Sequence, residues 1–63
     1  MTYEIYKPNG VWVSSKKYTD QSEAEAVALQ KSSDNKGETY GVRPVGGYAV
    51  ALFEDGRKFE AVR

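Results

Sequence analysis

Residues 48–62 read YAVALFEDGRKFEAV, and this stretch decides the fold. Its first six residues form a short apolar run with the length and composition of a buried strand. Asp55-Gly56 follows, and this dipeptide is the strongest short signal for a two-residue β-hairpin turn. Residues 58–62 supply the returning strand. The stretch therefore predicts an antiparallel hairpin near the centre of a sheet.

The hairpin turn also fixes which side chains share a face. It pairs Leu52 with Phe59 and Val50 with Ala61, and it sets Phe53 opposite Lys58. One face is then apolar throughout, whereas the second carries Ala49, Ala51, Phe53 and Val62, interrupted by Lys58 and Glu60. Because one helix covers only one face, the other face is exposed, curled against the N-terminal hairpin, or used to meet a partner.

A second hairpin is expected at the N-terminus. Residues 3–6 alternate and are rich in strand formers, and residues 11–14 read as the returning strand. A three-residue loop of Pro8, Asn9 and Gly10 would join them, with Gly10 in a left-handed conformation. This register sets Lys7 opposite Val11.

The same register makes Tyr6 and Trp12 direct cross-strand neighbours. If Ile5 and Val13 face the helix, the aromatic pair faces solvent and is a candidate contact surface. If the pleat is reversed, Trp12 is the largest side chain of a small core. The sequence leaves both readings open.

Between the hairpins lies a helix signal. Asp20 is the expected N-cap, with Glu23 completing a capping box and Thr19 as the competing cap. The apolar stripe of this helix carries Ala24, Val27, Ala28 and Lys31, with Leu29 at the edge. Polar residues 32–36 interrupt the stripe, and Gly37 is a natural stop. Residues 39–43 then predict a strand that ends at Pro44, and the glycines at 46 and 47 predict a turn.

The order is strand, strand, helix, strand, strand, strand within a single domain of 63 residues. This order predicts an α+β fold, with one helix packed on a largely antiparallel sheet of four to five strands. A β-grasp-like arrangement is one specific form, and it would pair the first and last strands in parallel.

The composition argues against chemistry. The chain has no cysteine and no histidine, so thiolate catalysis, serine hydrolysis of the Ser-His-Asp type and the usual zinc ligands are excluded. No calcium loop or phosphate-binding glycine motif is present. We therefore expect no enzyme, no metal and no cofactor. Without disulfides, a signal peptide or a long apolar run, we expect a cytoplasmic protein that makes no membrane contact.

The aromatic and basic residues are the best candidates for a binding surface. Lysines adjoin an aromatic residue in the first half of the chain, and a basic pair adjoins one in the second half. Aromatics interleaved with positive charge can meet a protein or stack on nucleic-acid bases. The candidate binding residues are Tyr6, Trp12, Lys16, Lys17, Tyr18, Arg43, Phe53, Arg57 and Lys58.

A stretch of the first half resembles short bacterial hairpin-helix domains of unknown function, through Asn9-Gly10, Ser14-Ser15, Tyr18-Thr19 and the alanine-bearing helix from Ser22. The resemblance covers about a third of the chain and implies no activity. Small size without catalytic residues is also typical of phage or prophage accessory proteins that bind and inhibit a host protein.

Three functions follow, all without catalysis. The first is a protein-binding module, such as a modulator or inhibitor of a host protein. The second is a nucleic-acid-binding domain, against which nine basic and nine acidic residues weigh because they leave no net charge. The third is a self-associating structural subunit that forms a homo-oligomer.

Overall fold

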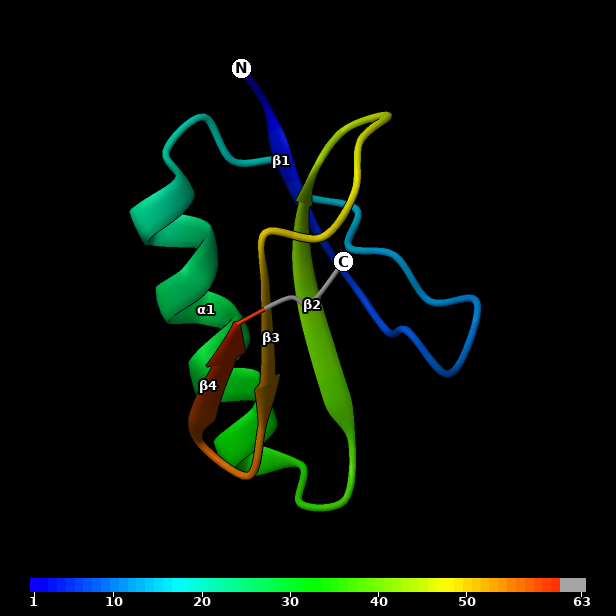
Figure 1. Ribbon diagram of the computed structural model, residues 1–63, viewed down its shortest axis with the longest axis vertical. Coiled ribbons are helices and arrows are strands. Elements are labelled where there is room, and N and C mark those ends of the chain that lie inside the picture. Colours follow the sequence, from blue (N-terminus) through cyan, green and yellow to red (C-terminus); the bar gives the residue numbers. More distant parts are fainter. Residues whose placement is uncertain (61–63) are drawn as a thin grey trace.

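The computed structural model describes residues 1–60, and it shows one helix packed on one face of a four-stranded antiparallel sheet (Figure 1). The elements are β1 (Tyr3–Tyr6), α1 (Gln21–Asp34), β2 (Thr39–Pro44), β3 (Ala51–Glu54) and β4 (Arg57–Glu60). The predicted α+β fold is confirmed.

The strands lie in the order β1-β2-β3-β4, so β1 and β4 occupy opposite ends of the sheet. The β-grasp-like alternative is therefore wrong, because it requires these two strands to pair in parallel. The free side of β1 is covered by the segment that leads to α1, through isolated bridges between Tyr3 and Tyr18 and between Tyr6 and Val13. If this bridged segment is counted as a strand, the elements follow the predicted order of strand, strand, helix, strand, strand, strand.

The register of the N-terminal hairpin differs from the predicted one by a single residue. Lys7 O accepts a hydrogen bond from Gly10 N at 3.1 Å, and the backbone at Gly10 does not take a positive φ. Lys7 N donates to Trp12 O at 3.1 Å, so the loop has four residues, 8–11, instead of three. Proline at the second position and glycine at the fourth suit a type I turn, which needs no left-handed residue.

This shift moves Trp12 to the helix side of the sheet, because one residue of slip exchanges the two faces. The prediction that Tyr6 and Trp12 share a face is wrong. The Trp12 ring packs edge to face on Tyr40, with 6.0 Å between ring centroids. Trp12 nevertheless stays 39% exposed, since it lies at the rim of the core.

The core between sheet and helix is small. Ile5, Val42 and Phe53 come from the sheet, and the alanines at 24 and 28 let α1 approach closely. Asp20 is the N-cap as predicted, and its carboxylate accepts a hydrogen bond from Ser22 N at 3.0 Å.

The helix runs further than its apolar stripe predicts, to Asp34 instead of ending before Ser32. Ser32 is fully buried, donates its hydroxyl to Leu29 O at 2.8 Å and accepts from Gly56 N at 3.0 Å. A serine with both roles satisfied is compatible with the core. The sequence pattern alone reads it as a loop residue.

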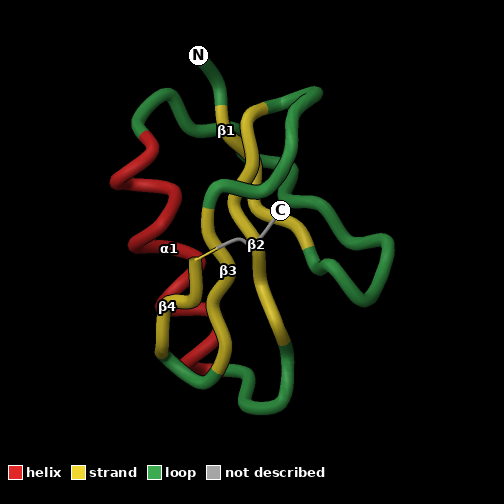
Figure 2. The backbone as a smooth tube through the Cα atoms, viewed as in Figure 1, coloured by secondary structure: helices red, strands yellow, loops and turns green. Residues whose placement is uncertain are grey.

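The C-terminal hairpin is built as predicted. Asp55 and Gly56 have φ values of 54° and 76°, as a type I′ turn requires, and Leu52 pairs with Phe59. Ala61, which the sequence pairs with Val50, lies outside the described residues, as does Val62. The apolar run begins its strand later than predicted, and Tyr48 is exposed in the loop before it. Figure 2 shows this loop between β2 and β3.

Candidate binding site on the outer face

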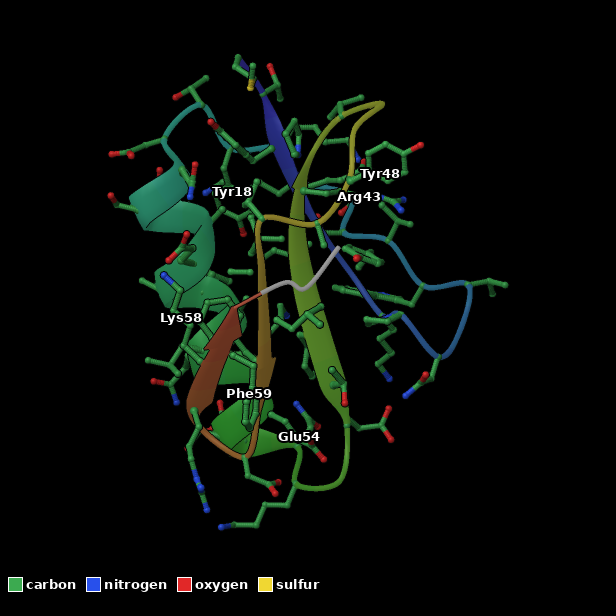
Figure 3. All side chains as sticks on the ribbon, in the orientation of Figure 1. Tyr18, Arg43, Tyr48, Glu54, Lys58 and Phe59 are labelled. Atoms are coloured by element: carbon green, nitrogen blue, oxygen red, sulfur yellow. The ribbon has the colours of Figure 1, made fainter. Side chains whose placement is uncertain are left out.

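The outer face is the side of the sheet opposite α1. Strand alternation and register place Glu4 and Tyr6 of β1 on it, together with Arg43 of β2. Leu52 of β3 and Phe59 of β4 continue the same face towards the other edge. Figure 3 shows Arg43 on the side away from α1, whereas Lys58 points towards the helix.

The Tyr6 ring lies directly against β2 at Gly41, its register partner. A Cβ atom at Gly41 would come within 2.6 Å of Tyr6 Cε1 and 2.8 Å of Tyr6 Cζ. No side chain larger than that of glycine fits at this point unless the ring moves. The glycine thus allows the aromatic ring to lie flat against the sheet, and a half-buried tyrosine forms the floor of the site.

Arg43 links this ring to a carboxylate. Its guanidinium carbon is 4.2 Å from the Tyr6 ring centroid, and its Nε donates to Glu4 Oε2 at 2.7 Å. Lys17 Nζ lies 3.2 Å from the other oxygen of Glu4. The hydrogen bond from Arg43, joined by the one from Lys17, holds the pKa of Glu4 below its ordinary value although burial opposes this. Glu4 is therefore ionised at neutral pH.

A shallow groove of about 370 Å³ runs beside this arrangement, between the N-terminal loop and β2. Val11 and Val13 border it and are 99% and 38% exposed. Its lining residues are Tyr6, Lys7, Pro8, Gly10, Val11, Trp12, Val13 and Arg43. The groove therefore combines apolar walls with a floor of tyrosine and arginine.

Three of the nine candidate residues line this groove. Tyr6 and Arg43 do so from the outer face, and Trp12 does so from its rim, because its ring packs against Tyr40 on the helix side. Lys17 lies next to it through its ion pair with Glu4. Two aromatic candidates, Tyr18 and Phe53, are core residues with 6% and 2% exposure, so neither offers a surface to a partner.

The remaining candidates lie elsewhere. Lys16 Nζ sits 5.1 Å from the ring centroid of Tyr18. Arg57 and Lys58 belong to β4 at the far end of the sheet, and Lys58 Nζ binds Glu25 Oε1 of α1 at 2.8 Å. The structure thus brings together only part of the predicted set.

Sequence reasoning missed several residues that build the groove. The sequence predicts a regular returning strand that contains Val11 and Val13, and it sets Lys7 opposite Val11. Lys7 Nζ binds Glu38 Oε1 at 2.7 Å, a bond that raises the pKa of Lys7 and keeps it charged. The sequence carries no signal for the exposure of Val11, since Val11, Trp12 and Val13 form an apolar run that reads equally well as a buried strand.

The described residues that line the groove include no carboxylate. Among residues 1–60, no three carboxylates, histidines or cysteines are grouped so that they could hold a metal ion. In the same part of the chain, every buried side-chain nitrogen or oxygen has a hydrogen-bond partner. No helix within it is long and apolar enough to cross a bilayer.

Comparison with protein-family models, with curated proteins and with solved structures found no match to this chain.

Proposed function

We propose that the chain is a non-catalytic protein-binding module and that the groove on the outer face is its contact surface. The carrying observation is the exposure of Val11 and Val13 on either side of Trp12, at the border of the groove. Tryptophan, tyrosine and arginine are the residues most enriched at binding hot spots, and all three line this groove. A domain this small acts by covering a site on a larger protein, as modulators and inhibitors do.

Nucleic-acid binding is the weaker alternative, because the aromatic rings are already covered by cations. The guanidinium of Arg43 lies over Tyr6, and Lys31 Nζ lies 5.5 Å from the ring centroid of Trp12. Stacking on bases needs an open ring face. The basic side chains at the groove are also paired with carboxylates, Arg43 with Glu4 and Lys7 with Glu38, which reduces attraction for a polyanion.

An enzyme is disfavoured by the residues that the groove contains. Among the described residues that line the groove, the titratable side chains are those of Tyr6, Lys7 and Arg43. General acid–base chemistry near neutral pH calls for a histidine or for a carboxyl with a raised pKa. Glu4, the nearest carboxyl, has a lowered pKa.

The test is capture of a protein by the immobilised chain from a lysate of its source, with matched surface variants. Val11→Asp with Val13→Asp should abolish capture, because the charges replace the apolar walls. Val45→Asp, at an exposed valine outside the groove, should leave capture intact. Nuclease-sensitive capture that weakens steeply with salt would instead support the nucleic-acid alternative. Equal capture by both variants would refute the groove as contact surface.

A further inference from the structure

The groove has a charge preference that its apolar walls do not reveal. Of the described residues that line it, only Lys7 and Arg43 are charged, and both are basic. The carboxylates that pair with them, Glu38 and Glu4, are not lining residues. The ammonium of Lys7 lies on the helix side, 5.6 Å from the ring centroid of Tyr40. Arg43 and Lys17 share the one carboxylate of Glu4, so this cluster keeps one net positive charge beside the apolar walls of the groove.

Arg43 is held in place before any partner arrives. Glu4 binds its Nε, and the ring of Tyr6 lies under the guanidinium at 4.2 Å. The hydrogen bond to Glu4 uses Nε, and the Arg43 side chain is about one third exposed. A guanidinium fixed in this way loses little conformational entropy when it binds a carboxylate through its terminal nitrogens.

We propose that the groove recognises an acidic peptide segment, with Arg43 binding a carboxylate of that segment. The inference rests on the proposed protein-binding function and specifies the chemistry of the partner. An extended peptide presents alternate side chains to opposite sides. Acidic residues on one side would reach Arg43, and apolar residues on the other side would contact Val11 and Val13.

The carboxylate source favoured here is a peptide and not a nucleic-acid phosphate. A polyanion carries charge along its whole length, and Glu4 lies close to Arg43. A segment with separated carboxylates can bind the exposed side of Arg43 and avoid Glu4. The walls at Val11 and Val13 add apolar contacts that a phosphate backbone cannot use.

The experiment is an NMR titration of the ¹⁵N-labelled chain with two probes, acetyl-EVDIE-amide and its uncharged analogue acetyl-QVNIQ-amide. The acidic probe should shift the amides of residues 6–13 and of Arg43, with a Kd near or below about 1 mM. The uncharged analogue should bind at least about tenfold more weakly. Absence of shifts with the acidic probe at several times that concentration, or equal binding of the two probes, would overturn the proposal.

Two arginine variants provide the matched control. Arg43→Gln should weaken binding of the acidic probe about tenfold or more, whereas Arg57→Gln, at an exposed arginine on β4 outside the groove, should bind as the wild type does. The ¹⁵N spectrum of Arg43→Gln shows whether it is folded. If it is not, Arg43→Lys replaces it, because a lysine keeps the charge but cannot form the same two-nitrogen contact and should also weaken binding.

A third probe separates the alternatives. A single-stranded oligothymidylate that shifts the same amides more tightly than the acidic peptide would overturn the proposal in favour of nucleic acid. A captured protein partner that binds Arg43→Gln and Arg57→Gln equally well would refute the role of Arg43 and leave the protein-binding function standing. The protein-binding function is tested separately, by whether Val11→Asp with Val13→Asp abolishes capture.

Discussion

Arg43 and Glu4 sit directly opposite each other on neighbouring strands, and the guanidinium Nε binds the carboxylate at 2.7 Å. The two residues are 39 positions apart in the chain, and β2 brings them together only after α1 has crossed the sheet. The pair ties the N-terminal strand to the centre of the sheet. It also orients the guanidinium over Tyr6, which makes a structural ion pair part of the candidate site.

Acid should weaken the fold through Glu4. Its pKa is lower in the folded chain than its ordinary value of 4.5, so its stabilising effect is complete above pH 4.5 and is lost as the pH falls through the lowered pKa. We expect the wild type to lose free energy of unfolding below pH 4.5 more steeply than Glu4→Gln, as measured by urea denaturation at several pH values. Glu23→Gln, at an exposed helical position, should keep the wild-type acid response. An identical response in Glu4→Gln would contradict the account.

Gly41→Ala should destabilise the fold by about 1–3 kcal/mol, because the new Cβ would overlap the Tyr6 ring. The displaced ring should also lose its contact with Arg43, which changes the NMR shifts of the Tyr6 ring protons. Thermal unfolding measures the first effect. Gly10→Ala is the control, since its Cβ would be 3.9 Å from the nearest atom and its stability should change by less than about 0.5 kcal/mol. Unchanged ring shifts in Gly41→Ala would show that Tyr6 does not lie on β2.

Ser32→Ala should lower the free energy of unfolding by about 1–2 kcal/mol, because the amide of Gly56 loses its acceptor in the C-terminal hairpin turn. Amide exchange at Gly56 should accelerate as well. Ser33→Ala, one residue further along and exposed, should change stability by less than about 0.5 kcal/mol. Equal behaviour of the two variants would mean that Ser32 does not join α1 to this turn.

Trp12→Ala should cost about 1–3 kcal/mol, less than truncation of a fully buried aromatic, because the ring packs on Tyr40 but stays partly exposed. Trp12→Phe should retain most of the wild-type stability, since phenylalanine can keep the edge-to-face contact. Urea denaturation followed by circular dichroism compares the three proteins. Complete unfolding of Trp12→Ala would identify Trp12 as the anchor of the core.

The sequence predicts the C-terminal hairpin well and the N-terminal one only in outline. Asp55-Gly56 admits one favourable loop length, so its register follows from local turn chemistry. The turn at Pro8 suits three or four residues equally, and neighbouring contacts such as Trp12 on Tyr40 select the longer loop. The same limit applies at Ser32, whose hydroxyl partners belong partly to a distant turn.

The candidate site could be predicted only in pieces. Tyr6, Trp12 and Arg43 stand out as residue types, but nothing local places Arg43 over Tyr6. That contact depends on the pairing of β1 with β2 and on the space above Gly41, both of which are long-range. Likewise, the burial of Phe53 and Tyr18 depends on which face the helix covers. A pattern that is apolar on both faces cannot specify this.

Amide hydrogen exchange of the chain, alone and with its captured protein partner, tests the central claim most directly. Binding at the groove should slow exchange at residues 6–13 and around Arg43, and it should leave the solvent-facing side of α1 unchanged. Protection confined to α1 or to the β4 edge, with residues 6–13 unaffected, would contradict the assignment of the groove as the binding surface.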